Sequence, residues 1–186
     1  MSRIVLPGEP LVDASTALRP WRDEDLAPMV AACQDPEIQR WTRVPTPYRE
    51  ADARQFLLGR FDGIHAGTTA PFAIVAADDD RELIGSISLM TIDARHRRAE
   101  VGYWVARAAR GQGHATRAVR LISAWGFSAL GLERLDLLAA TGNRASQRVA
   151  ERSGFQREGV LRSYMSAKAG RQDMVSYGLL ASDSES

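Results

Sequence analysis

The chain has 186 residues, a formal net charge of +1 from 24 basic and 23 acidic side chains, and one cysteine, Cys33. The near balance of charge argues against nucleic acid or an anionic membrane as a partner, and a single cysteine excludes an intramolecular disulfide. The length fits one domain over residues 1–186, with no stretch long enough to span a bilayer and no apolar signal segment at its start, so a cytoplasmic protein is expected.

The first half of the chain is expected to form one strand followed by helices. Residues 1–14 hold two prolines and a glycine and predict an irregular lead-in, and residues 16–21 predict the first strand. Asp23 and Asp35-Pro36 are typical helix starts. Cys33 lies in the first of these helices, among apolar residues, and is interpreted as a packed thiol.

A loop with two prolines, residues 43–48, separates these short helices from a longer one over residues 49–65. The apolar positions of the longer helix predict an amphipathic helix: Ala53, Phe56, Leu57 and Phe61. Trp41 comes just before the loop. It has two open interpretations, a core residue or part of a binding surface.

The middle of the chain predicts sequential antiparallel strands. Residues 71–78 and 83–93 are β-like and are joined by an Asp-rich turn, and residues 99–105 form the next strand. The basic residues 94–98 between them are interpreted as a solvated loop rather than a nucleic-acid patch. The three histidines of the chain are scattered and do not predict a metal site.

A glycine-rich stretch, Arg110-Gly111-Gln112-Gly113-His114-Ala115, follows that third strand. Apolar residues then recur at helical spacing over residues 114–130, which predicts a helix. A glycine loop that enters a helix N-terminus presents free backbone N–H groups and the positive end of the helix dipole, so it favours an anion such as a phosphate.

Two familiar phosphate signatures do not fit this loop. The P-loop lysine and hydroxyl are missing, because Leu132 and Glu133 follow Gly126 and Gly131, the only nearby glycine pair with that spacing. The dinucleotide fingerprint requires Gly or Ala where this chain has Thr116. A third signature, Arg/Gln-x-x-Gly-x-Gly/Ala, is satisfied by Arg110, Gly113 and Ala115. A turn that only links strand to helix is the alternative.

The last third predicts a strand over residues 134–140, a helix over 145–153, and two strands around a turn at 168–171. The helical connection from the glycine loop makes the strand at 134–140 parallel to the strand at 99–105. The Ser-rich residues 182–186 predict a frayed tail.

Four elements in order resemble one branch of the GNAT acetyltransferases, the ribosomal-protein N-terminal (RimJ/RimL-like) acetyltransferases. Besides the glycine motif, they are Ala-Glu-Val-Gly-Tyr-Trp-Val (99–105), Asn143-x-x-Ser146 with Glu-Arg-Ser-Gly-Phe (151–155), and the closing segments 158–162 and 173–175. The resemblance implies the GNAT fold. That fold is α/β (α+β), with a mixed, mostly antiparallel sheet of about seven strands, helices on both faces and one splayed parallel pair.

The resemblance also implies acetyl-coenzyme A as cosubstrate, and no metal is expected from the spacing of the histidines. In the family the glycine motif holds pyrophosphate, which here assigns Arg110, Gly111, Gln112, Gly113, His114, Ala115 and Thr116. The splayed strand places Trp104, Val105 and Ala106 beside the cofactor, with a backbone N–H near Val105 on the thioester carbonyl. Asn143 would contact the pantetheine arm, and Trp41 falls where the family binds its acceptor.

Two catalytic roles follow from the same resemblance. Glu100 shares a strand face with Trp104 and is the candidate base acting through water, with a surface charge paired to Arg97 or Arg98 as the alternative. Many GNAT enzymes protonate the leaving thiolate with a tyrosine where this chain has Ala150. The branch uses a serine, here Ser146, whose alternative role is to satisfy free N–H groups at the helix start.

The expected function is therefore acetyl transfer to a primary amine, by direct attack on the thioester. The expected acceptor is a protein α-amino group or a small-molecule amine. Whether the protein forms a homodimer is left open by the sequence. The alternative is a non-catalytic coenzyme A-binding module that serves as a sensor or scaffold. Nucleic-acid binding would have only the basic residues 95–98 behind it.

Overall fold

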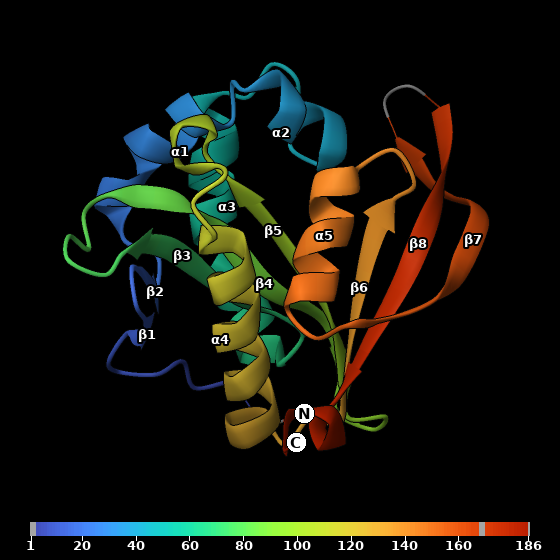
Figure 1. Ribbon diagram of the computed structural model, residues 1–186. Helices are drawn as coiled ribbons and strands as arrows, with labels where there is room; N and C mark the ends of the chain where they lie inside the picture. The colour runs from blue at the N-terminus through green and yellow to red at the C-terminus, as the bar shows by residue number, and fades with distance from the viewer. Residues whose placement is uncertain (1–2, 168–169, 186) are drawn as a thin grey trace.

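The computed structural model describes residues 3–167 and 170–185, and a single eight-stranded sheet runs through them in the order β1-β2-β3-β4-β5-β6-β8-β7 (Figure 1). The strands are β1 (Leu11–Asp13), β2 (Thr16–Arg19), β3 (Ala70–Ala76), β4 (Leu83–Asp93), β5 (Arg98–Val105), β6 (Arg134–Ala140), β7 (Gln156–Ala167) and β8 (Gly170–Leu180). Only β5 and β6 pair in parallel, and all other described neighbours are antiparallel. The expected mixed sheet with one parallel pair is confirmed.

Helices cover both faces of this sheet, as Figure 1 shows. They are α1 (Leu26–Ala32), α2 (Pro36–Trp41), α3 (Glu50–Ala66), α4 (His114–Leu130) and α5 (Arg144–Arg152), with short 3-10 turns η1 (Asp23–Asp25), η2 (Arg107–Ala109) and η3 (Ala181–Glu185). Two buried clusters result among the residues that the structure describes. The larger lies between the sheet and α4, and the smaller lies under α1, α2 and α3.

Helix α4 forms because its apolar residues recur every three or four positions and face the sheet. Ala118, Val119 and Ile122 are fully buried, and the Trp125 ring packs edge-on against Phe72 of β3, with 5.2 Å between ring centroids. The helix ends at Gly131, whose positive φ of 62° suits glycine. This packing fixes the N-terminal end of α4 relative to β5.

One strand lies in the segment predicted to be irregular. Residues 11–13 pair with β2 as the edge strand β1, which raises the strand number to eight. The segment is too short for a periodic pattern, and its strand conformation comes from pairing with β2. The predicted tail also differs, since residues 181–185 form η3, with Asp183 accepting a hydrogen bond from the Leu180 N–H.

The apolar face predicted for α3 is only half right. Ala53 and Leu57 are buried, but Phe56 and Phe61 are 38% and 50% exposed. The face that meets the core follows Ala53, Leu57 and Ile64 instead. Cys33 is buried as predicted, and burial raises the pKa of its thiol to about 12.

No helix among residues 3–167 and 170–185 is long and apolar enough to cross a membrane. The turn predicted over residues 168–171 falls partly outside the described residues.

Candidate active site

The glycine stretch forms the predicted turn into a helix. Gly111 and Gly113 have positive φ angles of 80° and 86°, and α4 begins directly after them at His114. Within the described part of the chain, no hydrogen bond uses the backbone N–H groups of residues 111–116. A Cβ at Gly111 would meet no atom within 4 Å, so a ligand can approach this backbone closely. The turn has the donors and the open surface that an anionic group needs.

The Arg110 side chain connects this turn to two other elements. Its Nε donates to the Val105 carbonyl at 3.1 Å, and its Nη2 lies 3.3 Å from Oδ1 of Asp35. Asp35 also caps α2, because the same oxygen accepts from the N–H of Glu37 at 2.7 Å. Burial raises the pKa of Asp35, but the hydrogen bonds from Glu37 and Arg110 outweigh it and leave the pKa below its usual value.

The His114 side chain turns away from the glycine turn. Its Nδ1 lies 2.9 Å from the Thr16 hydroxyl of β2, and the ring is buried. Burial, and secondarily the charge of Arg117, lowers the pKa of His114. Only the backbone of His114 is therefore available at the turn.

Strands β5 and β6 separate beside this turn. They pair through only three positions, ending at Glu100 opposite Asp136. Beyond that pair, β5 continues along β4 to Val105 while β6 continues along β8. The predicted splay of the parallel pair is thus present, and it leaves one edge of β5 without a strand neighbour.

Backbone alternation decides which groups of β5 face the gap between the separated strands. The Ala106 N–H donates to the Ile84 carbonyl of β4 at 2.8 Å, so it is already engaged. Because neighbouring residues of a strand point their N–H groups in opposite directions, the N–H of Val105 faces the gap. Of the two, Val105 alone retains a donor for a ligand there.

The β5 side chains divide as predicted between the two faces of the sheet. Trp104 packs against the cluster under α1, α2 and α3, whereas Val101 and Tyr103 belong to the cluster on the α4 face. Glu100 alternates with Trp104 and so faces the α1–α3 side. Glu100 and helix α4 are therefore on opposite faces of the sheet.

Glu100 is half-buried at the start of the gap, and no ion pair joins it to Arg97 or Arg98 among the described residues. Arg97 instead pairs with Glu133. Burial raises the pKa of Glu100, with a lowering effect from Arg43 and a further rise from Asp136. The surface-charge alternative requires a pair of Glu100 with Arg97 or Arg98, and neither pair is present among the described residues. Sequence reasoning did not identify Arg43 or Asp136 as neighbours of this carboxylate.

Asn143, Ser146 and Tyr103 meet at the start of α5. The Asn143 side chain caps the helix by accepting from the Ser146 N–H at 3.1 Å, so capping does not need the serine hydroxyl. The Ser146 hydroxyl instead accepts a hydrogen bond from the Tyr103 hydroxyl at 3.0 Å. Tyr103 was missed as a site residue, although strand alternation had already placed it on the face opposite Glu100.

Trp41 is half-buried and lies outside the apolar core, which removes the core interpretation. Its Nε1 donates to Glu37 at 2.8 Å, and its ring lies against the backbone of Gly142, one residue before Asn143. Helix α2 therefore contacts the glycine turn through Asp35 and the end of β6 through Trp41.

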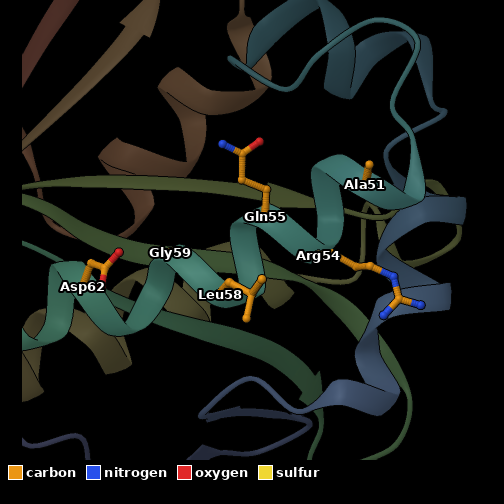
Figure 2. Close-up of a pocket in the computed structure, with 6 residues that line it drawn as sticks. All are labelled: Ala51, Arg54, Gln55, Leu58, Gly59 and Asp62. Carbon is orange, nitrogen blue, oxygen red and sulfur yellow. The ribbon is translucent and has the colours of Figure 1, made fainter.

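A separate hollow of about 680 Å³ lies on α3 and not at the strand gap. Figure 2 shows that one helix provides all six lining residues: Ala51, Arg54, Gln55, Leu58, Gly59 and Asp62. With one wall, it does not enclose a ligand, and none of the predicted site residues belongs to it.

Comparison with known proteins agrees with this geometry. Residues 16–156 match the family described as "Acetyltransferase (GNAT) domain". A Bacillus subtilis relative, "Uncharacterized N-acetyltransferase YoaA", is 44% identical over 87 residues, 47% of this chain and 49% of its own length. The chain thus matches about half the length of the relatives with which it shares over 40% identity.

Two Escherichia coli relatives differ in the acceptors that their names give. The ribosomal-protein-serine acetyltransferase is 32% identical over 113 residues, covering 61% of this chain and 62% of the relative. The spermidine N(1)-acetyltransferase is 29% identical over 147 residues, covering 79% and 76%.

Among solved structures, Mycobacterium smegmatis RimJ in complex with CoA-disulfide superposes with a TM-score of 0.83. The match covers 90% of this chain and 83% of that one at 24% identity, which supports the fold alone.

Proposed function

The chain belongs to the GNAT acetyltransferases, and on that premise we propose that it transfers an acetyl group from acetyl-coenzyme A to a primary amine. One observation carries the proposal. The gap between β5 and β6 lies beside the glycine turn of α4, with Glu100 on one face of the sheet and Ser146 on the other.

The glycine turn would hold the pyrophosphate of the cosubstrate. The unused backbone N–H groups of residues 111–116 supply donors, and the 17-residue helix behind them adds the positive end of its dipole. Arg110 contributes positive charge beside the turn, shared with Asp35. Relatives of the same fold were solved with coenzyme A or acetyl-coenzyme A, which supports this choice of ligand.

The thioester would lie along the open edge of β5, where the Val105 N–H can donate to its carbonyl oxygen. Glu100 removes a proton from the amine through water, and the nitrogen lone pair then attacks the carbonyl carbon. A C–N bond forms and the C–S bond breaks. The negative charge that builds on the oxygen is stabilised by the backbone donor.

The thiol leaving group would be assisted by Ser146. Asn143 already caps α5, so the serine hydroxyl is free of that task and can donate toward sulfur. An ordinary thiol has a pKa of about 8.5, so its thiolate departs readily and needs only modest help.

The acceptor is proposed as an amine that enters from the α1–α3 side, past Trp41 and the loop that holds Arg43. A protein α-amino group is favoured by the branch resemblance and by the ribosomal-protein-serine acetyltransferase among the relatives. A small polyamine is the second candidate, because spermidine N(1)-acetyltransferase is also a relative.

Release of coenzyme A thiol, measured against a library of peptides and small amines, tests the proposal. Amine-dependent thiol release supports acetyl transfer and identifies the acceptor class. Tight binding of acetyl-coenzyme A with no turnover on any acceptor would instead favour the non-catalytic coenzyme A-binding module.

A further inference from the structure

The hydrogen bond between Tyr103 and Ser146 joins two elements that are 43 residues apart in the chain. Tyr103 lies on β5, three residues past the last pair with β6, and Ser146 lies in the first turn of α5. The bond therefore crosses from one side of the strand gap to the other. It ends on the hydroxyl that is proposed to face the leaving group.

The phenol reaches this place from the strand and not from the helix. Ala150, one turn after Ser146 on α5, is fully buried and carries no hydroxyl. The Tyr103 ring packs with the cluster on the α4 face, which holds the side chain in one direction. A rigid ring thus presents its hydroxyl to Ser146.

The direction of the bond follows from acidity. A phenol is a stronger acid than an aliphatic alcohol, so Tyr103 donates and the Ser146 oxygen accepts. A serine hydroxyl has one hydrogen. This hydrogen cannot point along the line to Tyr103, because the phenol hydrogen already lies between the two oxygens. The Ser146 hydrogen must therefore point away from Tyr103.

From this geometry we infer that Tyr103 is a positioning residue, which orients the Ser146 hydroxyl as a hydrogen-bond donor to the departing sulfur. The inference rests on the proposed acetyl transfer and adds to it the group that holds the serine. Tyr103 keeps its own proton throughout. Burial raises the pKa of Tyr103 to about 12, against a lowering effect of the bond to Ser146, so the phenol stays a donor over the working pH range.

Kinetics of Tyr103→Phe, Ser146→Ala and the double variant provide the test. Phenylalanine keeps the packed ring and removes only the hydroxyl. We expect kcat to fall by about tenfold, the loss typical of one hydrogen bond, with little change in KM for acetyl-coenzyme A. The double variant should be no slower than Ser146→Ala, because both single changes remove the same function.

A second buried phenol provides the matched control. The Tyr177 hydroxyl of β8 donates to Glu151 of α5 at 3.2 Å, so Tyr177→Phe removes a similar strand-to-helix bond from the same helix. It should change the melting temperature comparably and leave kcat unchanged. Cofactor-induced stabilisation, measured for every variant, shows whether the cofactor site is intact. If Tyr103→Phe does not fold, Tyr103→Met replaces it, since methionine fills irregular space.

The outcomes distinguish the role of Tyr103 from acetyl transfer itself. Suppose that the wild type turns over. If Tyr103→Phe then has the kcat of the wild type, or if the losses of the two single variants add in the double variant, the role of Tyr103 is overturned and acetyl transfer stands. Full activity of Ser146→Ala would also overturn the role of Tyr103 and leave acetyl transfer standing. Absence of amine-dependent thiol release from the wild type overturns the proposed function itself.

Discussion

Glu100 and Asp136 lie opposite each other in the last register pair of β5 and β6, where the two strands separate. The strand gap therefore begins between two carboxylates. Burial raises the pKa of Glu100, Arg43 lowers it and Asp136 raises it again, with a net rise above the ordinary value. A carboxylate with a raised pKa is a stronger base, provided that the pH is high enough to keep it ionised.

Neutralising these neighbours should shift the acidic limb of the pH profile of kcat/KM in opposite directions. Asp136→Asn removes a nearby negative charge, which lowers the pKa of Glu100 and moves the limb to lower pH. Arg43→Met removes a positive charge and moves the limb to higher pH. Glu133→Gln, at an exposed carboxylate that pairs with Arg97, is the control and should leave the limb in place. Shifts of the same sign in both variants would contradict the assignment of Glu100 as the base.

Glu100→Gln should lower kcat by about 10²–10⁴-fold, the range for loss of a proton-transfer group. Cofactor affinity should change little, because Glu100 faces the α1–α3 side of the sheet. Ser146→Ala should lose less, since a thiolate leaves fairly well unaided. Steady-state rates of thiol release check both. If Glu100→Gln keeps its activity within about twofold of wild type, the loss is far smaller than that range, and Glu100 returns to the surface-charge interpretation.

The pH at which the rate levels off should identify the amine. An α-amino group has a pKa of about 7.7–8.0, so kcat/KM should bend at about pH 8 and reach its plateau by about pH 9, and the Glu100→Gln defect should shrink there. A lysine-like amine, with a pKa near 10.4, must be deprotonated at a cost of roughly 4 kcal/mol at pH 7.4. A profile that still rises steeply above about pH 9 would point to such an aliphatic amine.

Acetyl-coenzyme A at ~100 times its Kd should stabilise the fold by ~2.7 kcal/mol. For a domain of this size the melting temperature should rise by roughly 5–10 °C. Gly113→Val should abolish that rise, because a valine side chain there would stand in the proposed pyrophosphate site, where its Cβ would also lie 2.7 Å from Nη1 of Arg117. Gly131→Val, at the other end of α4 and also at positive φ, is the control. It should lower the starting melting temperature and keep the rise.

The buried ion pair of Arg19 and Asp25 should dominate stability near β2. The two side chains are 2% and 3% exposed, with two contacts of 2.7 Å between them. Arg19→Met leaves the carboxylate buried without its charge partner and should cost about 3–5 kcal/mol. Arg54→Met, which breaks an exposed pair with Glu50, should cost about 0.3–0.5 kcal/mol. Urea unfolding measures both, and equal losses would refute the difference in burial as the cause.

The sequence allowed most of the fold to be predicted because local patterns decide most of its elements. The predicted bounds of β4 and β6 agree with the structure, and the glycine turn begins α4 where expected. Strand β1 escaped prediction, since three residues carry no readable period and only pairing with β2 orders them. The exposed Phe56 and Phe61 show that an apolar residue on a helix need not face the core.

The site was harder to predict, because its contacts join distant segments. Helical and strand periodicity placed Glu100 and Tyr103 on opposite faces, but could not tell which side chain Tyr103 would meet. Arg110 and Asp35 are 75 residues apart in sequence, and no local pattern connects them. The roles of Glu100, Ser146 and the cofactor-binding residues stay predictions.

Helix α2 connects the two places proposed to bind the cofactor and the acceptor amine. Its capping residue Asp35 contacts Arg110 at the glycine turn, and Trp41 at its other end lies on Gly142 after β6. A shift of this helix alters the surroundings of both places together. Any effect of a bound acceptor on cofactor affinity that passes through α2 must be matched by an equal effect of the cofactor on acceptor affinity. Coupling between cofactor affinity and acceptor affinity is therefore a property that α2, a helix of six residues, can carry.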